Sequence, residues 1–175
     1  MPTVIFQTVE KSNKMRGSEH LTILGAPCIL EYQLASLQNR GEWQLEVRPT
    51  NGGAAQFNLA RDKGGNLILA VGQSEPINLA KNAGAGEKGQ RELALKILSN
   101  LIQYGMTEVR IMKGDKETVS IPILGDRDGV PMEDTKDMNV ETPRRFRIFH
   151  YAPFAREGHS REYEHVKPKE PIAWV

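Results

Sequence analysis

The chain has 175 residues, of which 39% are hydrophobic and 26% are charged. These values are typical of a folded domain and exclude an intrinsically disordered chain, and the length suits a single hydrophobic core. The formal net charge is only +1, so any attraction to nucleic acid or to anionic lipid must come from where the charges sit. Cys28 is the only cysteine, which excludes an internal disulfide and predicts a small buried hydrophobic residue.

The N-terminal segment MPTVIFQTVEK has neither the basic region nor the long apolar stretch of a secretory signal. No uninterrupted apolar run approaches the length of about 18 residues that a membrane-spanning helix requires. We therefore expect a soluble, cytoplasmic protein with no membrane partner.

The first predicted elements are strands. Residues 4–9 and 21–34 are rich in Val, Ile, Leu and Thr, the residue types that favour strands. Gly25 and Pro27 break the second run, which indicates a bulge or corner there. Residues 29–37 also fit a short helix, because Leu30, Leu34 and Leu37 have helical spacing.

Three runs with alternating apolar residues follow, and together they predict an antiparallel meander. Alternation with a period of two places each set on one face of a strand. The glycines of 51–53 and 63–66 supply the positive φ that tight hairpin turns need. The alternating residues are Trp43, Leu45 and Val47, then Ala55, Phe57 and Leu59, then Leu67, Leu69 and Val71.

Residues 87–104 form an amphipathic pattern typical of a helix that ends at Gly105, and strands are predicted at 107–112 and 118–123. The predicted fold class is α+β: a mainly antiparallel sheet with one principal amphipathic helix and an extended C-terminal arm. We divide the chain into a core domain at 1–125, an acidic loop at 126–140, and a basic and aromatic C-terminal segment at 141–175 that packs on the core or on a neighbouring molecule.

No local motif indicates an enzyme. The GxGxxG string at 84–89 follows a polar loop instead of a buried strand, which favours a linker over a dinucleotide site. Ser74 lies in a near match to a nucleophile elbow, but Pro76 replaces the second glycine, so a turn is favoured. Aligning Gly129 with the glycine of a calcium loop places Leu124 and Thr135 at ligand positions. We therefore predict no catalytic residue, no cofactor and no metal.

The C-terminal segment contains the candidate binding site. If residues 144–151 form a strand, one face carries Phe146, Ile148 and His150, and the other carries Arg145, Arg147, Phe149 and Tyr151. Arginines neutralise phosphates while aromatic rings stack on bases, the combination that single-stranded RNA or DNA requires. The predicted nucleic-acid-binding residues are Arg144, Arg145, Arg147, Phe149, Tyr151, Arg156 and Arg161.

A structural role for the same residues remains open. Phe149 and Tyr151 would then pack on a neighbouring element, and the arginines would form ion pairs with Glu141, Glu157, Glu162 or Glu164. The order of elements, a meander followed by one helix and further strands, resembles that of whirly and related single-strand-binding folds. This similarity of layout implies a binding function and names no site.

An alternative function is a structural subunit of a homo-oligomeric assembly, such as a viral particle. Pro168 and Pro171 favour an extended C-terminal arm. The arm would dock on a neighbouring copy through Ile172, Trp174 and Val175. An enzyme with no recognisable local motif is the third class of function.

Overall fold

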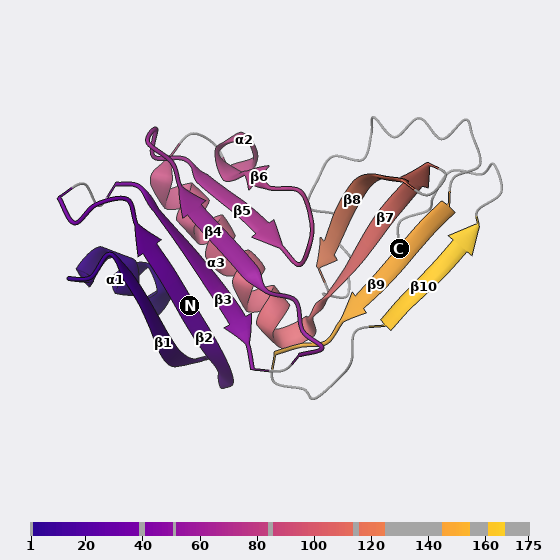
Figure 1. The fold of residues 1–175 in the computed structure, drawn as a ribbon, viewed down its shortest axis with the longest axis horizontal. Helices are drawn as coiled ribbons and strands as arrows, with labels where there is room; N and C mark the ends of the chain where they lie inside the picture. The colour runs from indigo at the N-terminus through magenta and orange to yellow at the C-terminus, as the bar shows by residue number, and fades with distance from the viewer. Residues whose placement is uncertain are drawn as a thin grey trace.

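The computed structural model describes residues 2–38, 41–50, 52–83, 86–113, 116–124, 145–154 and 161–166. It is an α+β protein built on antiparallel sheets, as the sequence predicts (Figure 1). Its elements are α1 (Val4–Lys11), β1 (Arg16–Ile23), β2 (Ala26–Leu34), β3 (Trp43–Pro49), β4 (Phe57–Arg61), β5 (Leu67–Val71), β6 (Ile77–Asn78), α2 (Leu79–Ala83), α3 (Glu87–Tyr104), β7 (Met106–Lys113), β8 (Lys116–Leu124), β9 (Arg145–Tyr151) and β10 (Arg161–Val166).

The first sheet is a six-stranded antiparallel meander in the order β1-β2-β3-β4-β5-β6. The predicted meander is confirmed as β3, β4 and β5, with Leu45 opposite Leu59 and Leu59 opposite Leu69. These three leucines are buried, because strand alternation directs them to the face that α3 covers (Figure 1). The second face of this sheet carries polar residues, including Gln44 and Asn58.

The helix α3 has the predicted bounds, and its buried stripe includes Ala94, Leu98 and Leu101. Gly105 ends the helix with a φ of 74°, a conformation that favours glycine. Cys28 is buried in the core, and this burial raises the pKa of its thiol to about 11. The prediction of a buried cysteine is therefore confirmed.

Two local predictions at the N-terminal end are wrong. Residues 4–9 belong to α1 and not to a strand, and Ile5, Phe6 and Val9 are its buried residues. These positions also satisfy helical spacing, so packing of the helix on the sheet outweighs the weak strand propensity of β-branched residues. The alternative helix at 29–37 does not form, because β2 continues through Leu34.

The second sheet contains four antiparallel strands in the order β10-β9-β7-β8. The predicted strands after α3 are confirmed as β7 and β8. β9, from the segment 141–175, pairs along its full length with β7, from the segment 1–125. Figure 1 shows the two sheets side by side, with α3 leading directly into β7.

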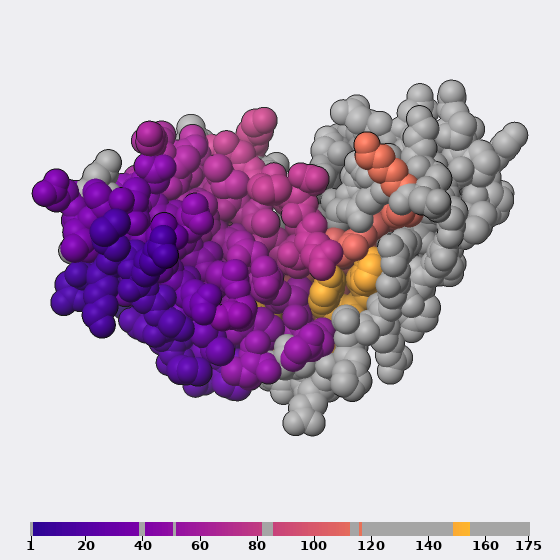
Figure 2. All heavy atoms as spheres, in the orientation of Figure 1, coloured from indigo at the N-terminus to yellow at the C-terminus, as the bar shows by residue number. Residues whose placement is uncertain are grey.

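Backbone contacts at one end of β9 join the two sheets. The Ala152 amide donates to the Gly53 carbonyl at 2.9 Å, and the Phe154 amide donates to the Ile102 carbonyl at 3.1 Å. The Phe154 side chain is 2% exposed and belongs to the core of the first sheet. Part of the segment 149–154 is visible at the surface where the two sheets meet (Figure 2). The start of β7 and the end of β9 are thereby fixed to the first sheet.

Candidate nucleic-acid interface on β9

The stretch of the chain that carries the candidate site is extended, as the binding hypothesis requires. β9 spans Arg145–Tyr151 and pairs with β7 on one side and β10 on the other. Because residues of a strand alternate between its two faces, one face carries Arg145, Arg147, Phe149 and Tyr151. Their partners in β7 are Met112, Arg110, Glu108 and Met106.

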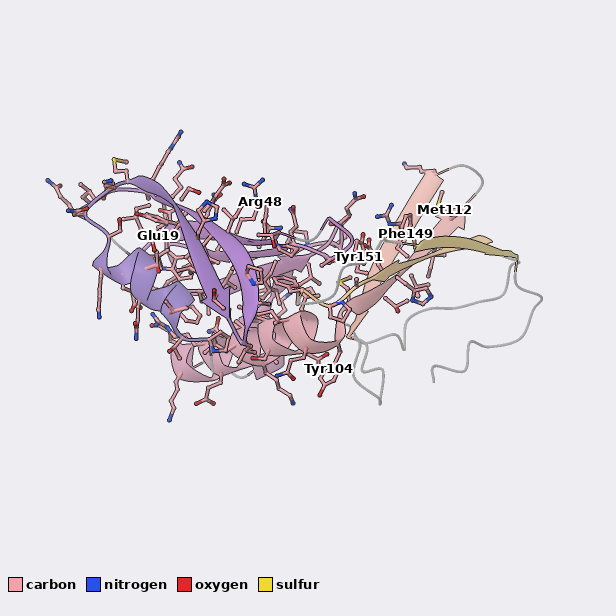
Figure 3. The ribbon with its side chains drawn as sticks, turned by 90° about the horizontal axis from the view of Figure 1, so that it is seen from below. Glu19, Arg48, Tyr104, Met112, Phe149 and Tyr151 are labelled. Carbon is pink, nitrogen blue, oxygen red and sulfur yellow. The ribbon has the colours of Figure 1, made fainter. Side chains whose placement is uncertain are left out.

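Phe149 is partly buried and stacks against an arginine of the neighbouring strand. The Arg110 guanidinium carbon lies 4.0 Å from the centre of the Phe149 ring, a distance suited to a cation–π contact. Tyr151, Phe149 and Met112 follow one another away from the first sheet (Figure 3). An arginine and an aromatic ring thus already lie in contact on this face.

Glu108 organises the same face from β7, and its side chain is fully buried. Its Oε1 atom accepts a hydrogen bond from Nε of Arg110 at 3.0 Å, and its Oε2 atom accepts one from the Tyr151 hydroxyl at 3.0 Å. A buried carboxylate is tolerated because a cation and a hydroxyl both satisfy it. Burial and the negative charge of Glu108 raise the pKa of Tyr151 to about 12, so the phenol is neutral at physiological pH.

The loop after β5 completes this network from the first sheet. Gln73 Oε1 accepts a hydrogen bond from Nη2 of Arg110 at 2.8 Å. Gly72 has a φ of 58°, and a Cβ atom there would lie 3.1 Å from Oε2 of Glu108. A glycine therefore lets the loop approach the buried carboxylate closely. We call Gln73, Glu108, Arg110, Phe149 and Tyr151 the junction network.

The strand register also brings acidic residues beside the predicted arginines. Glu164 of β10 is the backbone partner of Arg147, and Glu162 is the partner of Phe149. On the other side, Arg147 is the partner of Arg110. Opposite charges on neighbouring strands stabilise a sheet and like charges oppose it. This register is compatible with the structural role for the arginines as well as with a ligand site.

The structure does not bring all predicted residues together. Arg161 of β10 is the backbone partner of His150, which belongs to the opposite face of β9 from Arg145 and Arg147. Arg144 and Arg156, like the docking residues Ile172, Trp174 and Val175, lie outside the described residues.

Ser74 and the glycine-rich segment before α3 form local turn and helix-end contacts. Ser74 donates a hydrogen bond to the Val71 carbonyl at 2.8 Å, as a turn residue does. Gly86 is the N-cap of α3. Glu87 in the first turn of α3 forms ion pairs with Arg61 and Arg91, so a carboxylate already occupies the helix end where an anion would bind.

The sequence interpretation missed Gln73, Glu108 and Arg110. Glu108 and Arg110 alternate with Val109 and Ile111 in a predicted strand, a pattern typical of a strand with one exposed face. In the structure Arg110 is 8% exposed and Glu108 is fully buried. Their opposite charges at positions i and i+2 were the available signal, since such residues share a face.

Among the described residues, no group of three or more His, Cys, Asp or Glu side chains is arranged to hold a metal ion. No helix in the same residues is both long enough and apolar enough to span a bilayer. Comparisons of this chain with models of protein families, with curated proteins and with solved structures found no match.

Proposed function

We propose that this chain is a non-enzymatic binding protein that binds single-stranded nucleic acid on the face of the second sheet that includes Arg145, Arg147 and Phe149. The observation that supports this proposal is the extended conformation of β9. Because alternate residues of a strand share a face, these three residues fall on the same face. The cations contact phosphates and the ring stacks on a base, without selecting a sequence.

In this proposal, the residues of the junction network have a different role from that of Arg145 and Arg147. Arg110 is almost fully buried and already engaged with Glu108 and Gln73, so its contribution is to hold the Phe149 ring. The Tyr151 hydroxyl is bonded to Glu108, which gives Tyr151 a positioning role. Electrostatic attraction for phosphate then comes from Arg145 and Arg147.

The test is a fluorescence-anisotropy titration with labelled single-stranded DNA and RNA of about 16 nucleotides, the upper range for one binding fold. In the Arg145→Ala/Arg147→Ala variant, two phosphate contacts are lost. Counterion release at single strands then predicts an affinity roughly 60-fold weaker at about 50 mM salt, and a log–log salt slope smaller by about 1.4.

Lys63→Ala/Lys88→Ala is the matched control, because it removes the same charge at exposed positions outside the second sheet. It should change the affinity little. Glu162→Gln/Glu164→Gln should strengthen binding, since both residues belong to the strand that pairs with β9. The proposal is wrong if the native protein does not bind at low salt, or if the two charge-removing variants lose affinity equally.

A further inference from the structure

The outer edge of β1 is an open edge of the first sheet. β1 is eight residues long and pairs with β2 over its whole length without a register shift. Within the described residues, no strand pairs with its other side. It contains no proline, and proline and bulges are common means of blocking an edge. Its free backbone groups can therefore accept another strand.

The opposite edge of the same sheet has a different design. β6 is only two residues long and leads directly into α2. Short edge strands and covering elements protect a sheet against added strands. In the part of the chain that the structure describes, β1 has neither of these two protections.

A groove lies between α1 and the β1–β2 hairpin, where Glu19 of β1 and Tyr32 of β2 both line it. Its volume is about 480 Å³, and it is lined from α1 by Val4, Gln7 and Lys11, from the following turn by Lys14, and from β1 by Glu19. Glu19 lies between α1 and the first strands (Figure 3). An edge strand beside a helical groove is the arrangement in which proteins bind extended peptides: the backbone extends the sheet and alternate side chains enter the groove.

The charges of the groove indicate the chemistry of its occupant. Lys11 and Lys14 line it, and neither forms an ion pair with a described residue. Glu19 is the one acid that lines the groove, so lysines exceed acids there by one. The excess of cations favours an acidic side chain at the position of the peptide that faces the groove.

The ends of β1 add exposed apolar contacts. Met15 is 47% exposed and Leu24 is 46% exposed, and they flank the strand. Leu24 has a φ of 50°, a conformation that is costly for leucine and usual for glycine or asparagine. A strained and exposed leucine at a hairpin tip is consistent with selection for contact.

We propose that β1 and α1 form a binding site for an extended acidic peptide of a partner protein, which adds to the first sheet as a seventh strand. The site is separate from the β9 face and does not depend on nucleic-acid binding.

The probe is a fluorescein-labelled peptide that alternates Glu and Val over eight residues, the length of β1. Anisotropy measures its affinity, and amide chemical shifts of the labelled protein locate the site. We expect shifts in β1 and α1. Lys11→Glu/Lys14→Glu should weaken binding roughly tenfold through two exposed ion pairs, and should improve binding of the peptide that alternates Lys and Val. Lys63→Glu/Lys88→Glu, with the same charge change elsewhere, should bind as the native protein does.

A version of the acidic peptide with methylated backbone nitrogens cannot donate to the edge and should not bind. Three results would overturn the proposal: no shift in β1 at millimolar peptide, shifts confined to β9, or equal binding of the methylated peptide. Concentration-dependent shifts in β1 without peptide, with a doubled mass by light scattering, would show instead that a second copy of the chain occupies the edge.

Discussion

Removing the Glu108 carboxylate should destabilise the protein more than any surface change. In Glu108→Leu, Arg110 keeps its charge in a site where its side chain is 10% exposed, and the Tyr151 hydroxyl loses its acceptor. Leaving one member of a buried pair uncompensated costs about 3–5 kcal/mol. For a chain of this length, that loss lowers Tm by roughly 6–20 °C.

The double variant Glu108→Leu/Arg110→Met separates the buried charge from the loss of packing. With both charges gone, apolar side chains of similar size fill the site and the desolvation cost disappears. We expect the double variant to recover part of the stability lost in Glu108→Leu; it still lacks the cation–π contact with Phe149, worth about 1 kcal/mol, and the acceptor of the Tyr151 hydroxyl.

Urea denaturation with two probes measures these effects. Far-UV circular dichroism follows both sheets. Tryptophan fluorescence follows the first sheet, where Trp43 is 2% exposed, because Trp43 is the only tryptophan in a Trp174→Phe background. Glu92→Ala is the control, because Glu92 belongs to an exposed pair with a separation of 3.9 Å and should cost less than about 1 kcal/mol. The explanation fails if Glu108→Leu costs no more than this control, or if the double variant is less stable than Glu108→Leu.

Two further predictions concern the same junction. The pKa of Tyr151 is raised from 10.0 to about 12, so the folded state keeps the phenol proton up to a higher pH than the unfolded chain does. The stability that comes from this difference is complete below pH 10 and is lost as the pH rises to 12. Tyr151→Phe should therefore lose less stability than the native protein between pH 10 and 12, and parallel Tm curves would contradict this. Gly105→Ala should cost about 3 kcal/mol or more, because φ is 74° and the new Cβ would lie 2.2 Å from the Tyr151 carbonyl oxygen. Gly52→Ala, whose Cβ meets nothing within 4 Å, should cost far less in the same denaturation assay.

Local patterns in the sequence predict those elements whose apolar periodicity matches their surroundings. The strands that contain Leu45, Leu59 and Leu69 alternate because one face is buried, and α3 carries a continuous apolar stripe. The pattern at Ile5, Phe6 and Val9 fits two structures, and packing on the sheet decides between them. β9 was predictable as a strand, but its pairing with β7 across more than 30 residues of chain is non-local and leaves no periodic signal.

The candidate site was less predictable than the fold because its central carboxylate is buried. A strand that alternates charged and apolar residues is expected to expose its charges. In β7, however, Val109 and Ile111 are buried on one face and Glu108 and Arg110 on the other. The charges are tolerated there because Tyr151 and Gln73 complete their hydrogen bonds, and both partners come from distant segments of the chain.

This burial also determines which substitutions can test nucleic-acid binding. A change at Glu108, Arg110 or Tyr151 breaks a satisfied buried network, so any loss of affinity would be mixed with a loss of stability. Arg145 and Arg147 lie farther along β9, at the register positions of Met112 and Arg110. Comparing their replacement with the Lys63 and Lys88 control, at equal unfolding free energy, therefore isolates the electrostatic contribution of β9 from its contribution to folding.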